Sequence, residues 1–165
     1  MERPVLNIEL NFLDWVKEII AATSLMGMFG LLIFYFPDLP DKIPAHFNAA
    51  GEVDRFGSKA SIWVLPIVGV LLYLGLTGLN QFPHIYNYPV KITESNADHQ
   101  YRIVSRMIRT LKAVIMIFFF YTVYMTIQIG IGNHDGLKGY ALPTFLLMLF
   151  GTLIFYVAHS IRNRY

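Results

Sequence analysis

The sequence predicts an all-α membrane protein with four transmembrane helices, a short extracytoplasmic hairpin-like loop and a cytoplasmic amphipathic helix. Only 15% of the 165 residues are charged and 55% are hydrophobic, with a mean hydropathy of +0.49, whereas soluble domains are about 25% charged. Asp, Glu, Lys and Arg are absent from residues 19–37, 60–90, 113–134 and 139–161. Each run can supply the roughly 20 apolar residues that cross about 30 Å of hydrocarbon. This pattern excludes an ordinary soluble domain.

The predicted spans belong to one domain, residues 1–165, and lie near residues 19–36, 62–82, 112–132 and 141–161. Backbone groups in lipid must be hydrogen-bonded within their own segment, so each span is a helix. We expect no acid or base buried at membrane depth, which argues against a proton pump or an ion-coupled transporter. The chain has no cysteine, which excludes disulfides and thiol chemistry.

The basic residues predict the orientation of the spans. Nine of the 13 lie in the N-terminal segment, in the connection between the second and third spans and in the tail, and the other two connections hold four. The positive-inside rule therefore places both termini in the cytoplasm and the loop 37–61 outside. Residues 1–15 mix apolar and polar side chains, which favours a helix lying in the membrane interface with Trp15 at headgroup level.

The loop 37–61 has the strongest local signals in the chain. Three prolines, Pro37, Pro40 and Pro44, disfavour a continuing helix. Residues 48–51, Asn-Ala-Ala-Gly, suit a type I turn. We therefore expect residues 43–47 and 53–56 to pair as a short hairpin. Gly57 should end the hairpin, and Ser58 should cap the next helix.

The polar residues of this loop are the candidate ligand-binding or loop-organising residues: His46, Asn48, Gly51, Asp54, Ser58 and Lys59. His46 and Asp54 combine an imidazole with a carboxylate, which suits zinc or an acid–base pair acting on a headgroup or a peptide. The alternative is structural, with Asn48 and Asp54 bonding the turn's own amides. No residue is assigned a catalytic role, and no cofactor is expected because no phosphate loop or dinucleotide fingerprint is present.

A second feature is a helix predicted to start at Ser95, with Asp98 completing a capping box, and to run into the third span. Arg102, Arg106 and Arg109 share one face of this helix. They could contact anionic lipid or an acidic partner, or they could be a solvated face that sets topology. The net charge of +2 and the lack of a binding motif make a nucleic-acid partner unexpected.

The loop also resembles a known family. Its residues fit the pattern Pro-x-x-Ile-Pro-x-His-Phe/Trp-Asn followed by Gly-x-x-Asp-x-x-Gly-Ser-Lys, namely Pro40, Ile43, Pro44, His46, Phe47, Asn48, Gly51, Asp54, Gly57, Ser58 and Lys59. This pattern is similar to that of a small bacterial membrane domain of unknown function, which also forms the N-terminal part of SdpI-type immunity proteins. The resemblance implies a bacterial cytoplasmic-membrane protein with an extracytoplasmic motif loop. SdpI-type proteins protect their producer from a secreted toxic peptide.

Three functions remain open from the sequence. The leading hypothesis is a non-enzymatic envelope protein whose outward loop recognises a peptide or lipid ligand or gives immunity to a toxic peptide. The second is a membrane-embedded hydrolase or transferase that acts on lipid or cell-wall precursors through His46 and Asp54. The third is an accessory subunit of a larger membrane complex. The expected partners are membrane lipids, together with a membrane protein or further copies of the chain.

Overall fold

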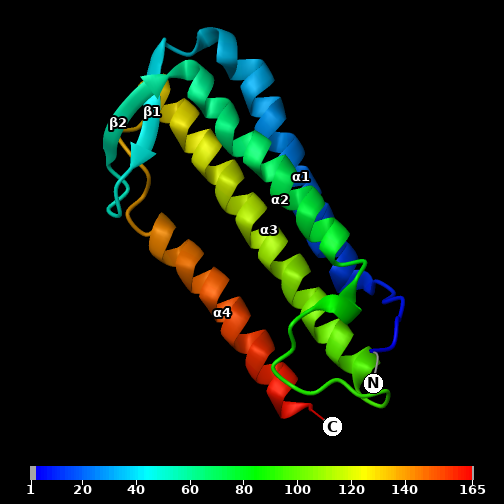
Figure 1. Ribbon diagram of the computed structural model, residues 1–165. Coiled ribbons are helices and arrows are strands. Elements are labelled where there is room, and N and C mark those ends of the chain that lie inside the picture. Colours follow the sequence, from blue (N-terminus) through cyan, green and yellow to red (C-terminus); the bar gives the residue numbers. More distant parts are fainter. Residues whose placement is uncertain (1–2, 165) are drawn as a thin grey trace.

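The computed structural model describes residues 3–164, and within that range four long helices dominate the fold (Figure 1). They are α1 (Phe12–Tyr35), α2 (Val64–Leu79), α3 (Ala97–Gly130) and α4 (Ala141–Arg162). Together with flanking 3-10 turns, each helix is long and apolar enough to cross a membrane. The prediction of four spanning helices is confirmed, and the chain has the make-up of a multi-pass membrane protein.

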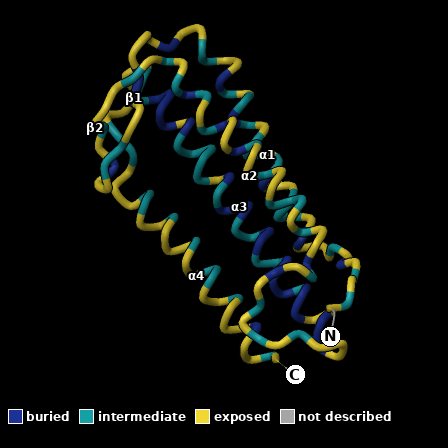
Figure 2. Tube along the Cα trace, viewed as in Figure 1, coloured by how far each residue is buried: buried dark blue, intermediate teal, exposed yellow. Residues whose placement is uncertain are grey.

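The central element is α3, whose 34 residues extend about 51 Å at 1.5 Å per residue. It packs against α1, α2 and α4, and its buried residues follow its whole length (Figure 2). The helix begins at Ala97, with Asn96 at the N-cap position and no side-chain capping bond, so the predicted capping box of Ser95 and Asp98 is wrong. The Asn96 side chain instead accepts a hydrogen bond from Thr93 N, within the preceding turn. From Ala97 the helix continues without a break through the whole of the predicted third span.

A tight apolar core joins α1, α2 and α3. Met28, Leu32, Met116 and Ile127 are fully buried there. Gly69 lets α2 approach α1 closely, since a Cβ at this position would lie 3.2 Å from Leu25 Cδ1 and Met28 Cε. Close approach at small residues is the usual way in which membrane helices pack without a hydrophobic driving force. In contrast, α4 packs on α3 and is exposed along most of its length.

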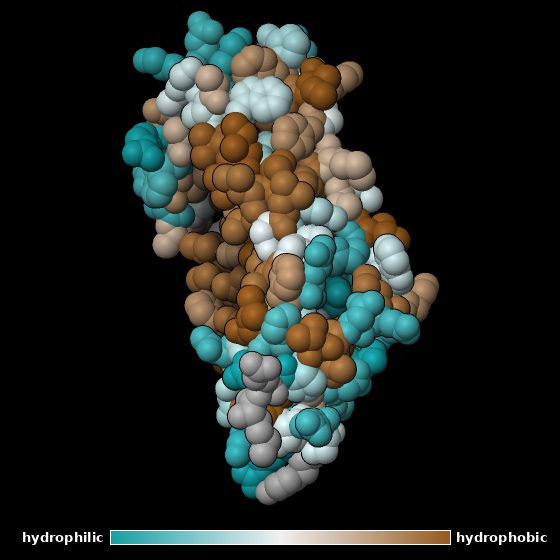
Figure 3. Space-filling view, turned by 45° about the vertical axis from the view of Figure 1, so that its right-hand side comes forward, coloured by the Kyte–Doolittle hydropathy of each residue, from teal (hydrophilic) through white to brown (hydrophobic). Residues whose placement is uncertain are grey.

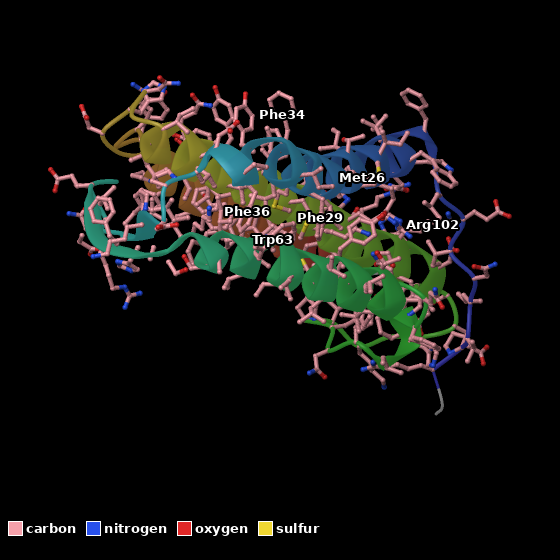
Figure 4. All side chains as sticks on the ribbon, turned by 90° about the horizontal axis from the view of Figure 1, so that it is seen from above. Met26, Phe29, Phe34, Phe36, Trp63 and Arg102 are labelled. Carbon is pink, nitrogen blue, oxygen red and sulfur yellow. The ribbon has the colours of Figure 1, made fainter. Side chains whose placement is uncertain are left out.

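Aromatic side chains pack between α1 and α2 near the hairpin. Phe29 and Phe36 lie 6.2 and 5.9 Å from the ring centroid of Trp63, all three gathered between the helices (Figure 4). Phe34 points away from the bundle and is 72% exposed. Such outward aromatics are expected where a helix surface faces lipid. The three clustered rings anchor the base of the loop that leads to the hairpin.

The hairpin consists of β1 (Lys42–Phe47) and β2 (Val53–Ser58), paired antiparallel from Lys42–Ser58 to Phe47–Val53. The predicted hairpin is confirmed, but the prediction that Gly57 ends it is wrong. Gly57 pairs with Ile43 inside the ladder. The pairing continues because Ile43 is fully buried in the apolar core, which holds this end of the hairpin against the bundle.

The N-terminal segment differs from its prediction. Residues 3–11 contain no helix, and α1 starts at Phe12. A capping box sets this start: Asn11 Oδ1 accepts from Asp14 N at 2.8 Å, and the Asp14 carboxylate accepts from Asn11 N. Tyr101 donates to the carbonyl of Pro4. Residues 3–11 therefore form an extended N-terminal strap; residues 1–2 of the predicted interfacial helix lie outside the described residues.

The two ends of the molecule are chemically different. Both termini lie at one end of the bundle and the hairpin at the other (Figure 1). Hydrophobic side chains gather over the middle of the surface, and hydrophilic ones are concentrated at the ends (Figure 3). A polarity of this kind fits a molecule that crosses a membrane along its long axis. Which end faces the cytoplasm stays a prediction.

Candidate ligand groove beneath the hairpin

The tip of the hairpin is tied to the connection between α3 and α4. Leu137 N donates to the carbonyl of Gly51 at 2.7 Å, and Glu52 forms an antiparallel bridge with Gly136. Gly51 has a φ of +87°, a backbone conformation that favours glycine. No pattern in the sequence predicts this contact, because the segment 131–140 has no alternation typical of a strand.

Beneath the hairpin lies a groove of about 690 Å³. Its walls come from both strands, the start of α2, the half of α3 nearer the hairpin and the segment before α4. The walls are mostly apolar, and the lining residues with large apolar side chains are Phe47, Phe56, Ile62, Val64, Leu65, Phe118, Val123, Leu137 and Leu142. Volumes of about 300–1,000 Å³ with mainly apolar walls are typical of ligand sites.

Polar side chains stand at the rim of this groove. His46 and Arg55, opposite each other in the strand register, both line it, and Lys138 joins them from the loop before α4. His46 Nδ1 lies 2.6 Å from Asp54 Oδ1. The two side chains are 56% and 42% exposed, and Asp54 itself is not part of the lining. The structure therefore brings His46 and Asp54 together, and of the two residues only His46 lines the groove.

The His46–Asp54 contact has clear chemical consequences. A carboxylate on Nδ1 holds that nitrogen protonated and leaves Nε2 free to act as a base, a donor or a metal ligand. Within residues 3–164, no group of three or more His, Asp or Glu residues is placed to hold a metal ion. In this arrangement Asp54 orients the imidazole, and the pair supplies one ligand atom, His46 Nε2.

Asn48 acts within the turn itself. Its Oδ1 accepts from Ala50 N at 2.9 Å and from Glu52 N at 3.0 Å, while its Nδ2 donates to the Glu52 carboxylate. Gly51 N also donates to the Asn48 carbonyl, as the predicted turn requires. Asn48 is therefore directed at the loop's own backbone, in the manner of an Asx turn.

Ser58 and Lys59 close the base of the hairpin. Ser58 Oγ accepts from Ala60 N at the start of the 3-10 turn η2 (Lys59–Trp63) that leads into α2. Lys59 Nζ donates to the carbonyl of Leu39 at 3.3 Å and lies over the ring of Phe36. Lys59 therefore links the two ends of the loop that carries the hairpin, whereas Ser58 caps the turn that follows it.

At the other end of the bundle, the structure contains a network of buried ions. Lys112 is completely buried, and its Nζ lies 2.6 Å from Glu18 Oε2 and 2.7 Å from Thr77 Oγ1. It also lies 4.6 Å from the centroid of the Tyr73 ring. The structure thus buries a cation at the start of the predicted third span, whereas the expectation that no acid or base lies within the hydrocarbon layer stays a prediction. No local pattern predicts this network, because Glu18 and Lys112 are 94 residues apart and meet only where α1 packs against α3.

The three arginines of the predicted face have separate partners. Arg102 pairs with Asp98 within α3, Arg106 lies 3.6 Å from Asp14, and Arg109 lies 3.4 Å from Glu18. The side chains of Arg102 and Arg106 are partly exposed, at 35% and 38%, whereas that of Arg109 is 5% exposed. Contact of Arg102 and Arg106 with anionic lipid stays a prediction, and Arg109 belongs to the interior of the bundle.

Two tyrosines order the connection between α2 and α3. Burial raises the pKa of Tyr86 to about 12 and also raises the pKa of Tyr88. Both phenols therefore remain donors at physiological pH. Tyr86 donates to the carbonyl of Leu79 at 2.6 Å, and Tyr88 donates to that of Pro83 at 2.8 Å. These bonds fix the connection beside the end of α2.

Comparison with known proteins shows what the chain resembles. Residues 24–70 match a family described as a domain of unknown function (DUF1648); this range holds the second half of α1, the hairpin and the start of α2. An uncharacterized protein of Archaeoglobus fulgidus is 34% identical over 76 residues, which cover 41% of this chain and 40% of the relative. The chain thus spans well under half the length of that curated relative. No solved structure matches the chain significantly. The hairpin accordingly lies in the part of the chain that matches this family, whereas the groove walls from α3 and from residues 137–142 lie outside it.

Proposed function

We propose that this chain lies in the bacterial cytoplasmic membrane with both termini in the cytoplasm, and that its outward-facing hairpin groove binds an extracytoplasmic peptide or lipid without altering it chemically. The observation that supports this most is the apolar groove of about 690 Å³ with its polar rim. An apolar body enters such a groove by the hydrophobic effect, while a few polar groups fix its orientation.

The polar residues at the rim, next to apolar walls, suit an amphiphilic ligand. Arg55 and Lys138 add positive charge beside the imidazole of His46. A ligand with an apolar chain and an anionic end would place the chain against Val64 and Phe118 and its charge at these donors. A hydrophobic peptide with a free C-terminal carboxylate has this character, as does an anionic lipid.

Immunity to a toxic peptide is the biological role that this binding would serve. The motif residues that resemble SdpI-type proteins build the hairpin, and the matched range 24–70 includes most of the hairpin side of the groove. A protein that sequesters a membrane-active peptide at the outer surface would need an apolar groove at that surface.

A pair of tryptophan variants tests the groove directly. Val64 lines the groove and is 57% exposed, whereas Val68, one turn later on α2, is 37% exposed and lies outside the lining. V64W should fill the groove, and V68W should present the same bulk elsewhere on the helix. Native mass spectrometry of protein released from mild detergent should show a bound amphiphile on the wild type and V68W that V64W lacks. Equal occupancy of all three proteins would contradict the proposal.

Catalysis by His46 and Asp54 is the second candidate, and the 2.6 Å contact between them supports it. In this case the imidazole would act on a lipid or cell-wall precursor as a base or a metal ligand. Metal analysis of the purified protein before and after H46A tests the metal form. A stoichiometric ion that disappears in H46A favours this candidate, and no ion in either protein counts against it.

A further inference from the structure

A second pocket, of about 530 Å³, lies at the end of the bundle that holds both termini. It is formed where the N-terminal strap crosses between α1, α2 and α3, and it shares no residue with the hairpin groove. Its polar lining residues are Asn7, Glu18, Tyr73, Thr77, Asn80, Gln81 and Arg109. Any ligand here would be independent of the proposed function of the groove.

Two buried donors at this pocket have no partner among residues 3–164. Arg109 is 5% exposed, and its Nη1 forms no hydrogen bond within this range; the same is true of the buried Nδ2 of Asn80. Leaving a buried donor unpaired costs about 1–3 kcal/mol, and more for a charged group. Unpaired buried donors are rare in native proteins, so these two indicate a hydrogen-bond acceptor that residues 3–164 do not supply.

The charges around the pocket leave an excess of positive charge. Glu18 is shared between Lys112 and Arg109, and only the Lys112 contact, at 2.6 Å, is short. Lys112 Nζ also donates to Thr77. Arg109 reaches Glu18 through Nε at 3.4 Å, so its outer nitrogen atoms can serve another acceptor. One carboxylate therefore faces two cations, and the group that would balance them is an anion.

We propose that this pocket binds a phosphate-type anion, held by the Arg109 guanidinium and the Asn80 amide. Both residues line the pocket, so a small shift of either side chain would bring its unpaired nitrogen to an occupant. The Glu18 carboxylate also lines the pocket, and its pairing with Lys112 limits its repulsion of an anion. Arginine forms paired hydrogen bonds with phosphate, which suits this role.

The depth of the site points to a lipid headgroup as the source of the phosphate. Arg109 lies about 32 Å along α3 from Gly130, at 1.5 Å per residue. This distance is close to the thickness of the hydrocarbon layer, about 30 Å. With the hairpin end of α3 at one membrane surface, Arg109 lies at headgroup level on the other.

The N-terminal strap provides an apolar wall on the outer side of the pocket. Leu6, Ile8 and Leu10 line it together with Trp15. The strap is held down by Arg3, whose Nη1 donates to the carbonyl of Tyr86 at 2.5 Å. The glycerol and upper acyl chain of a phospholipid would contact these side chains while its phosphate reaches Arg109.

The test compares two variants with the same charge change. N80D keeps the size of the side chain and the oxygen that faces Tyr86 OH, but replaces the unpaired donor with a carboxylate. N87D makes the same change at an exposed position outside the pocket. Native mass spectrometry in detergent would measure binding of dioleoyl phosphatidylglycerol, dioleoyl phosphatidylcholine and inorganic phosphate to wild type, N80D and N87D. Thermal unfolding of each protein verifies that it is folded.

We expect phosphatidylglycerol to bind wild type and N87D alike, and N80D about tenfold more weakly or worse. R109K, which keeps the charge and loses the forked donors, should also weaken binding and is the second variant if N80D does not fold. Binding of phosphatidylglycerol alone identifies a lipid site, whereas binding of inorganic phosphate that N80D weakens identifies a site for free anions. Equal affinities of wild type, N80D and N87D, or an equal loss in both variants, would overturn the proposal.

Discussion

Gly51 is constrained twice, by its backbone conformation and by its neighbour. Its φ is +87°, and a Cβ at this position would lie 2.7 Å from the carbonyl oxygen of Leu137. The left-handed conformation costs a residue with a side chain about 1–2 kcal/mol, and the close carbonyl belongs to backbone that cannot easily move. We therefore expect G51A to destabilise the protein by about 2 kcal/mol or more.

The measurement is thermal unfolding in detergent, with G75A as the control. Gly75 lies within α2, and a Cβ added there would have no neighbouring atom within 4 Å among the described residues beyond its own helix turn. Alanine at this position should therefore leave stability unchanged or raise it slightly. Equal melting temperatures for G51A and G75A would show that the hairpin tip is not held against the α3–α4 connection.

Lys112 tests the buried ion network at the scale of one residue. Removing one partner of a buried pair typically costs about 3–5 kcal/mol because the other charge loses its compensation. Arg109 remains beside Glu18, so we expect K112M to cost about 3 kcal/mol, at the lower limit. The double variant E18Q/K112M should regain part of this loss, and a double-mutant cycle on unfolding measures the coupling. Strict additivity of the two changes would contradict the pairing.

The turn of the hairpin is held by one side chain, that of Asn48. Asn48 accepts from two backbone amides and donates to the Glu52 carboxylate. N48A should therefore speed hydrogen exchange at the amides of Ala50 and Glu52 several-fold. N48D keeps the accepting oxygen but places a second carboxylate beside that of Glu52, so it should retain only part of the protection. Unchanged exchange in N48A would show that the contact with Leu137 alone orders the turn.

Elements with local signals were predictable from the sequence. The turn that starts at Asn48 and ends at Gly51 places both strands in order, and Ser58 marks the start of η2. The four spans follow from composition alone, since a membrane leaves few places for charge. Gly57 shows the limit of this reasoning, because the burial of Ile43 keeps the ladder paired beyond a residue that locally favours a break.

The features that the sequence did not predict arise between distant elements. Leu137 bonds Gly51 across the hairpin groove, and Lys112 meets Glu18 between α3 and α1. Neither contact follows from spacing along one helix or strand. The mixed pattern of residues 1–15 predicts an interfacial helix, but the capping box at Asn11 starts α1 at Phe12, and the bond from Tyr101 to the Pro4 carbonyl holds part of residues 3–11 against α3.

At the scale of the whole molecule, the two ends of the helix bundle carry different sites. The hairpin and its apolar groove occupy one end, and the termini, the ion network and the second pocket occupy the other. If basic residues set the orientation as the positive-inside rule predicts, the groove faces the outside and the arginine-lined pocket faces the inner leaflet. Each proposed site then meets the ligands expected on its own side.

The absence of cysteine from the sequence permits a direct test of this orientation. A49C places a single thiol at the exposed hairpin tip, and N87C places one at the opposite end, also exposed. In intact cells, a membrane-impermeant maleimide should label A49C at once, and it should label N87C only after the membrane is permeabilised. Labelling of N87C but not A49C in intact cells would contradict an outward-facing groove and the function proposed for it.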